Sequence, residues 1–235
     1  MSIQITYLAH SGFAVETATK VLVFDYYQDE QRIVRRYADG EKPLWFFVSH
    51  WHGDHFNRHI IDFSHKAQAY IVIKDVPFRQ APEDDRYSME VYDTRRIDDA
   101  IVPQFGSTDE GGSFLVRTDG LSLFHAGDLN WWHWDGDTDE NNENAKRMFD
   151  AEMQKLDGLT VDVAFFPVDA RLERAREWGV SEFLKHVTVK LCLVPMHYFG
   201  APWQPSEAFR KAWPDQPLWI PVHSGDTNYC GNTGT

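Results

Sequence analysis

The residues best suited to chemistry lie together at residues 49–55, where three histidines and one aspartate follow a serine. Neutral imidazoles and carboxylates are the ligands that zinc, iron and manganese accept in proteins. The alternatives are a polar loop that carries histidines by chance, or a strand end capped by hydrogen bonds. Because the whole chain has only 11 histidines in 235 residues, we interpret the cluster as a divalent metal site.

The elements around this cluster must position its ligands. Residues 43–48 form a continuous apolar run that is typical of a buried strand. A helix is expected over residues 57–66, with Asn57 as its N-cap. On the loop between them, His50 and His52 can point the same way while Asp54 and His55 turn toward a different point. One loop could therefore serve two adjacent metal positions.

This segment resembles the signature of the metallo-β-lactamase superfamily, His-x-His-x-Asp-His after a buried strand. Residues 7–13 and 21–25 resemble the opening strands of that superfamily. The Phe-His-Ala-Gly-Asp segment at 124–128 resembles its strand that ends in a metal-bridging Asp, and Val-Pro-Met-His-Tyr at 194–198 resembles its last metal-binding His. The similarity covers nearly the whole chain in the expected order. It is greatest to the branch that contains ascorbate-phosphate lactonase and N-acyl-phosphatidylethanolamine phospholipase D.

The resemblance implies a ligand set and a fold. Taken alone, Asp128 would be a turn or cap residue and His197 a structural histidine, so their assignment rests on the resemblance. The implied fold is α/β, an αββα four-layer sandwich in which helices flank two mixed β-sheets, formed as a single domain by residues 1–235. The implied metal ligands are His50, His52, Asp54, His55, Asp128 and His197.

One ligand of the superfamily is missing from this chain. A third histidine normally reaches the first metal position from a loop shortly before the bridging Asp, but residues 105–112 contain none. Three explanations stay open. Asp109, or less favourably a neighbouring Ser, Thr or Glu, replaces it; His10 or His133 reaches in from another loop; or the first position is weak or empty.

The function expected from these residues is metal-assisted hydrolysis by one or two divalent ions, zinc first and manganese or iron as alternatives. Asp54 would orient the attacking water or accept its proton, and Asp25 and Ser49 would hydrogen-bond to the ligand imidazoles. The substrate class is a small molecule carrying a lactone, a phosphodiester or another ester. The alternatives are a non-catalytic metal-binding or sensing protein with a degenerate first site, and an iron redox protein. His52 argues against the redox protein, because redox relatives carry Glu at that position.

Composition limits the partners. Acidic residues outnumber basic ones by 36 to 23, giving a net charge of −13, which argues against a nucleic-acid partner. Bound metal would still supply local positive charge for a small anionic substrate. No apolar run approaches the roughly 20 residues that span a bilayer, and the N-terminal residues do not form an export signal. A cytoplasmic protein with a small-molecule substrate is expected, and the sequence leaves its oligomeric state open.

Periodicity predicts the remaining elements. Strands are expected at residues 3–7, 12–15, 21–24, 69–73, 89–92, 100–102, 113–116, 121–125, 161–166, 190–194 and 218–222, and helices at 145–156, 171–178, 181–187 and 206–213. The first strand is expected at a sheet edge, Asp119-Gly120 is a hairpin signal, and Cys192 is expected in the core with Cys230 in an incidental tail. The aromatic loop at 130–137 offers Trp131 and His133 as substrate contacts; the alternative is that its rings fill a gap between sheet and helix.

Overall fold

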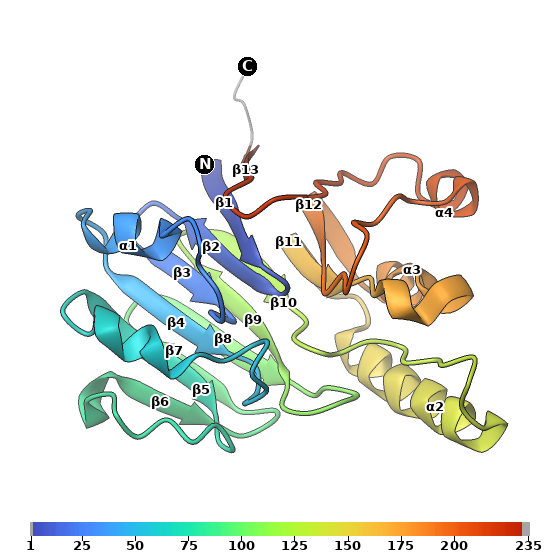
Figure 1. Cartoon of the computed structure of the whole chain (residues 1–235), viewed down its shortest axis with the longest axis horizontal. Coiled ribbons are helices and arrows are strands. Elements are labelled where there is room, and N and C mark those ends of the chain that lie inside the picture. The colour runs from blue at the N-terminus through green and yellow to red at the C-terminus, as the bar shows by residue number, and fades with distance from the viewer. Residues whose placement is uncertain (1, 232–235) are drawn as a thin grey trace.

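The computed structural model describes residues 2–231, in which two β-sheets pack face to face (Figure 1). Met1 and residues 232–235, which belong to the expected single domain, lie outside the described residues. The first sheet has the order β13-β1-β2-β3-β4-β5-β6 and the second the order β12-β11-β10-β9-β8-β7. Parallel and antiparallel pairs occur in both. The predicted α/β class with two mixed sheets flanked by helices is therefore confirmed.

The strands take their bounds from apolar runs and from the turns between them. The first sheet contains β1 (Ser2–Ala9), β2 (Gly12–Glu16), β3 (Val21–Phe24), β4 (Leu44–Val48), β5 (Ala67–Ile73), β6 (Arg86–Met89) and β13 (Thr227–Gly231). The second contains β7 (Thr94–Ile97), β8 (Ala100–Phe105), β9 (Ser113–Thr118), β10 (Leu121–His125), β11 (Thr160–Pro167) and β12 (Thr188–Met196). Every residue of β3 and β4 is buried, because both faces of these strands are covered.

Helices cover the outer sides of the two sheets. In Figure 1, α1 (Ile33–Ala38) and the 3₁₀ helix η1 (Arg58–Phe63) lie beside the first sheet, whereas α2 (Asp139–Leu156) and α3 (Trp178–His186) lie on the opposite side of the molecule. The short elements α4 (Glu207–Ala212), η2 (Glu83–Asp85) and η3 (Ala170–Ala175) complete the set. No helix within residues 2–231 is both long enough and apolar enough to cross a membrane.

The core between the sheets is largely aromatic. The Phe165 ring on β11 lies 4.6 Å from Phe13 on β2 and 5.9 Å from Phe24 on β3. Further along, Phe47 on β4 meets Phe114 on β9 at 5.5 Å. These contacts cross from one sheet to the other and fix how the strand ends of the two sheets face each other.

Several local predictions are confirmed. Asp119 and Gly120 join β9 to β10 with φ values of 51° and 71°, the pair of positive angles that a two-residue type I′ turn requires. Asn57 caps its helix by accepting a hydrogen bond from the His59 backbone N–H. Cys192 is buried in the core.

Other local predictions are wrong. The segments at 57–66 and 171–178 form the shorter 3₁₀ helices η1 and η3, and residues 218–222 contribute only a single bridge, from Leu218 to Leu193. The first strand, β1, is not at an edge, because it pairs with both β13 and β2; the edge strands of the first sheet are β13 and β6. Cys230 is therefore a buried strand residue, and its Asn- and Gly-rich surroundings concealed the strand.

The inter-sheet contacts make a stability prediction. Phe165→Ala should lower the free energy of unfolding by about 3–5 kcal/mol, because it leaves a cavity among packed rings. Tyr229→Ala is the matched control, since that ring is 71% exposed on β13, and it should change stability by less than about 0.5 kcal/mol. Urea denaturation of both variants checks this, and equal losses would contradict the assigned core.

Candidate metal centre

Segments that follow four strands converge at one end of the sandwich. His10 follows β1, residues 49–55 follow β4, Asp128 follows β10 and His197 follows β12. The strands are rigid and their ends meet at the same rim, so side chains far apart in sequence are brought within contact distance. His50, His55, Asp128 and His197 are all buried there.

The Asp128 carboxylate lies at the centre of this group. Its Oδ1 is 3.1 Å from His55 Nε2 and 3.3 Å from His197 Nε2. Its Oδ2 is 3.4 Å from His50 Nε2. The two oxygens thus face different imidazoles, which is the arrangement that a carboxylate bridging two cations requires.

Potential ligand atoms divide into overlapping groups around this carboxylate, and within each group they lie no more than 4.8 Å apart. On one side lie His52 and Asp109, both with Asp128. His50 and His55 form a second group with Asp128, and on the other side lies the group of His10, Asp54, His55 and His197. All six ligands predicted from the sequence are therefore brought together. Asp109, on the loop that lacks the third histidine, lies in one group with His52 and Asp128.

His10 lies on the other side of the cluster from His52 and Asp109. Its Nε2 is 3.6 Å from Asp54 Oδ2, and its ring lies 4.1 Å from that of His197. The alternative that His10 reaches the first position is therefore not what the geometry shows. The other alternative, His133, lies in none of these groups, and its Nε2 is 3.6 Å from Asp135.

The fit of a cation can be tested on the buried polar atoms. His10 Nε2, His50 Nε2, His55 Nε2 and Asp128 Oδ1 have no aligned hydrogen-bond partner among the described residues. An unpaired buried polar group costs about 1–3 kcal/mol, so several at one point would be a large penalty. Imidazole nitrogens and a carboxylate are also the donors that divalent zinc, manganese or iron bind. The donor set therefore fits such an ion.

The buried carboxylate of Asp25 hydrogen-bonds to the loop that carries the histidines. Asp25, directly after β3, accepts hydrogen bonds from the Ser49 backbone N–H at 2.8 Å and the Ser49 hydroxyl at 2.7 Å. It also lies 2.8 Å from His55 Nδ1, while the Ser49 Oγ is 3.0 Å from His50 Nδ1. The contacts predicted for these two residues are present, from Asp25 to His55 and from Ser49 to His50. Both imidazoles are thereby turned so that Nε2 faces Asp128.

Asp169 orients the His197 imidazole in the way that Asp25 orients His55, and it was not identified from the sequence. Its Oδ2 lies 3.0 Å from His197 Nδ1, and its side chain is fully buried. The only sequence signal was a lone Asp just past the β11 strand, which looks the same as a helix cap. It does cap η3, by accepting from the Arg171 backbone N–H.

Burial and the neighbouring charges set the protonation states. Burial, together with His197 and His55, lowers the pKa of His10 to about 2. Burial and His55 likewise lower the pKa of His50 to about 4. For Asp128, burial raises the pKa, but His55 and His197 outweigh it and hold the pKa well below its usual value. Burial lowers the pKa of His55, but Asp128 and Asp25 outweigh it and raise that pKa to about 10, and Asp128 and Asp169 raise the pKa of His197 in the same way. His10 and His50 are therefore neutral, whereas His55 and His197 would release their protons on binding a cation, because metal ligands must be deprotonated.

The loop that carries Asp109 is packed tightly against the histidine loop. The Gly112 N–H donates to the Ser49 carbonyl at 3.2 Å, and the Gly106 N–H donates to buried Glu152 of α2 at 3.2 Å. Gly111 has φ +72°, and a Cβ there would lie 1.9 Å from the Ser49 oxygen. Only glycine allows this close approach, which sets Asp109 opposite His52.

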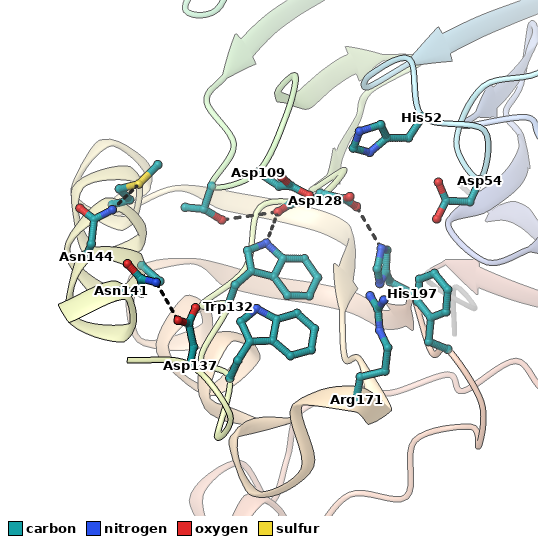
Figure 2. Close-up of a pocket in the computed structure, with 15 residues that line it drawn as sticks. His52, Asp54, Asp109, Asp128, Trp132, Asp137, Asn141, Asn144, Arg171 and His197 are labelled. Carbon is teal, nitrogen blue, oxygen red and sulfur yellow. Dashed lines mark hydrogen bonds and ion pairs between the residues drawn. The ribbon is translucent and has the colours of Figure 1, made fainter. Parts of the chain in front are cut away.

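A cavity of about 450 Å³ opens beside these groups (Figure 2). His52, Asp54, Asp109, Asp128 and His197 border it, and other walls come from Trp132, Trp134, Asn141, Asn144, Arg171 and Phe199. The rings of Trp132 and Trp134 are parallel, 6.0 Å apart, and the Trp132 indole N–H donates to the Asp128 carbonyl.

The two side chains expected to contact substrate lie elsewhere. Trp131 and His133 border a separate pocket of about 240 Å³ with Trp178. Their contact with substrate stays a prediction, whereas Trp132 and Trp134 face the clustered ligands. In an irregular loop, residue spacing gives no indication of which rings turn inward.

Comparisons with known proteins identify the family of this chain. The model of the "Beta-lactamase superfamily domain" matches residues 4–141. A protein from Methanosarcina mazei named "UPF0173 metal-dependent hydrolase" is 25% identical over 230 residues, covering 89% of this chain and 90% of its own.

Two solved structures share the fold. Igni18, named a novel metallo hydrolase, from Ignicoccus hospitalis superposes with a TM-score of 0.69 at 16% identity, over 97% of this chain and 98% of its own. CmlA, a diiron beta-hydroxylase from Streptomyces venezuelae, has a TM-score of 0.59 at 13% identity, over 96% of this chain and 54% of its own. At such identities the likeness concerns the fold alone.

The tight loop contact gives a testable prediction. In Gly111→Ala the new Cβ would collide with the Ser49 carbonyl oxygen. The free energy of unfolding of the metal-free protein should therefore fall by about 1–3 kcal/mol, and less metal should bind beside His52. Gly136→Ala is the control, because a Cβ there meets nothing within 4 Å. Denaturation and elemental analysis of both variants measure this. Wild-type stability and metal content in Gly111→Ala would refute the packing.

Proposed function

Starting from the fact that this chain belongs to the beta-lactamase superfamily, we propose that it is a metal-dependent hydrolase with two adjacent cation positions. The observation that carries the proposal is the set of buried, unpaired imidazole nitrogens around the Asp128 carboxylate. The name of the M. mazei relative supports the same activity.

We assign the ligands from these groups, and we give His50 to the first position because it faces Asp128 Oδ2, the oxygen opposite His55 and His197, and its ring lies 4.7 Å from that of His52. The first position would be held by His50, His52, Asp109 and Asp128, with Asp109 in place of the absent histidine. The second would be held by Asp54, His55, His197 and Asp128, with the unpaired Nε2 of His10 beside it. Cations held there, zinc first and manganese or iron as alternatives, would lower the pKa of a bound water from about 15.7 toward about 7 and polarise the bond under attack.

The residues of the chain contribute the rest. The Asp54 carboxylate is partly exposed to the cavity, so it can orient an attacking water and accept its proton. Asp25 and Asp169 keep the ligand imidazoles in one orientation. The rings of Trp132 and Trp134 exclude water from one wall, which strengthens electrostatic interactions in the cavity.

We infer a small substrate with an ester-type bond, either a lactone or a phosphodiester, because the cavity volume of about 450 Å³ suits a small molecule. We also propose that the chain belongs to the branch with ascorbate-phosphate lactonase and N-acyl-phosphatidylethanolamine phospholipase D. We propose a cytoplasmic location for it. The non-catalytic alternative rested on a degenerate first site. Asp109 within reach of His52 and Asp128 favours the hydrolase.

The activity is tested with a panel of lactones, phosphodiesters and thioesters, each offered to protein reconstituted with zinc, manganese or iron. We expect hydrolysis of at least one ester class, lost on chelation and restored by metal. Protein that binds metal but hydrolyses no member of the panel would support the sensing alternative. Iron with a visible absorption band would instead support redox chemistry.

Removing Asp109 tests the assignment of the first position. Asp109→Ala should bind about one metal ion per chain where the wild type binds about two. Its activity should fall by more than about 100-fold, the upper effect of changing a residue that only orients a ligand. Asp137→Ala, which removes a carboxylate of the same cavity that is in none of the ligand groups, should keep the wild-type metal content. Unchanged metal content in Asp109→Ala would exclude Asp109 as the replacement ligand.

A further inference from the structure

The charge of the cavity is uneven. Arg171 is the only Lys or Arg among the described residues that border it. Three of the four bordering aspartates, Asp54, Asp109 and Asp128, belong to the ligand groups, so bound cations would neutralise them. The fourth, Asp137, lies with Asn141 and Asn144 on the other side of the tryptophan rings from Arg171 (Figure 2).

The Arg171 guanidinium is held on one edge by Asp169. Its Nε lies 3.1 Å from Oδ1 and 3.0 Å from Oδ2, and its Nη2 lies 2.6 Å from Oδ2. These bonds occupy the Nε–Nη2 edge. Nη1 makes no hydrogen bond to a described residue, and the side chain is 44% exposed, so the donors of Nη1 are free to bind a ligand.

Aromatic rings restrain the guanidinium further. Its Cζ lies 3.7 Å from the centroid of Phe199 and 5.4 Å from that of Trp134. An arginine held by a carboxylate and by aromatic rings loses little side-chain entropy when it binds an anion. In Figure 2 its tip points up toward His197 and the clustered ligands.

The same carboxylate also sets the position of a metal ligand. Asp169 contacts Arg171 through one edge and His197 Nδ1 through Oδ2. The free donors of Arg171 are therefore fixed relative to the cation positions by one buried side chain. A substrate anion bound at Arg171 would place its own scissile bond at a constant distance from those positions.

We propose that Arg171 binds an anionic group of the substrate, and that this enzyme prefers small esters that carry a carboxylate or a phosphate away from the scissile bond. This inference rests on the proposed function, since it selects among the substrates of the same site. It makes Arg171 a specificity residue, which contacts the end of the substrate that does not react.

The test uses three esters of one acyl chain that end in a carboxylate, a phosphate or a neutral primary amide. With metal-loaded protein, Arg171→Gln should raise KM for the two anionic esters by about 10- to 100-fold, the effect of losing one hydrogen bond to a charged group. Its kcat and its metal content should stay near those of the wild type. The ester that ends in a neutral amide should be hydrolysed about equally well by the wild type and by Arg171→Gln. Whichever anionic ester shows the larger rise in KM identifies carboxylate or phosphate as the natural group.

The matched control is Arg174→Gln on the same 3₁₀ helix, because Arg174 pairs with exposed Asp135 and does not border the cavity. It should leave all three esters unaffected. Equal losses for anionic and neutral esters in Arg171→Gln, or loss of metal, would mean that Arg171 only supports Asp169 and would overturn the proposal. No loss for any ester would also overturn it.

A binding measurement separates this inference from the proposed activity. Tryptophan fluorescence of metal-loaded protein is titrated with butyrate, propyl phosphate and butyramide. The wild type should bind an anion more tightly than the amide, and Arg171→Gln should lose that preference even if no ester is hydrolysed. Equal affinity for anions and amide in the wild type would reject the anion site, whatever the outcome of the hydrolysis assays.

Discussion

The structure depends on one electrostatic constraint: an ionised Asp128 carboxylate is buried against three imidazoles. Its oxygens lie 3.1–3.4 Å from His50, His55 and His197, and among the described residues Oδ1 has no aligned hydrogen-bond partner. Buried charge is costly unless it is paired, so this arrangement is stable only if other groups hold it. A divalent cation on each side of the carboxylate would satisfy the same atoms, which is why the constraint indicates a metal centre.

The rest of the fold supplies the rigidity that this centre needs. The aromatic core fixes the two sheets relative to each other, and the ligands follow directly from strand ends. His10, Asp25 and His197 have positive φ values of 41–59°, an unfavourable conformation for such residues that surrounding contacts must hold. Ser49 holds Asp25, Asp169 holds His197, and the His10 carbonyl accepts a hydrogen bond from the His197 N–H. Asp169 also links the centre to Arg171.

Much of this could be predicted from the sequence, where local chemistry was distinctive. The segment at 49–55 and the hairpin at Asp119-Gly120 carried their own signals, and the two-sheet fold followed from the resemblance of the motifs to a known superfamily. Asp169 did not, because a single carboxylate after a strand is the same in sequence whether it caps a helix or orients a ligand. The strand β13 depends on its pairing with β1, and the inward-turned Trp132 ring packs 5.4 Å from that of His197. Both are contacts with distant segments, which no local pattern encodes.

The most direct test of the account is a crystal structure of the metal-loaded protein with anomalous diffraction at the edge of the bound metal. The account predicts two peaks on either side of the Asp128 carboxylate. One should lie among His50, His52 and Asp109, and the other among Asp54, His55 and His197. Peaks remote from Asp128, or no peak in protein that contains metal by elemental analysis, would contradict it.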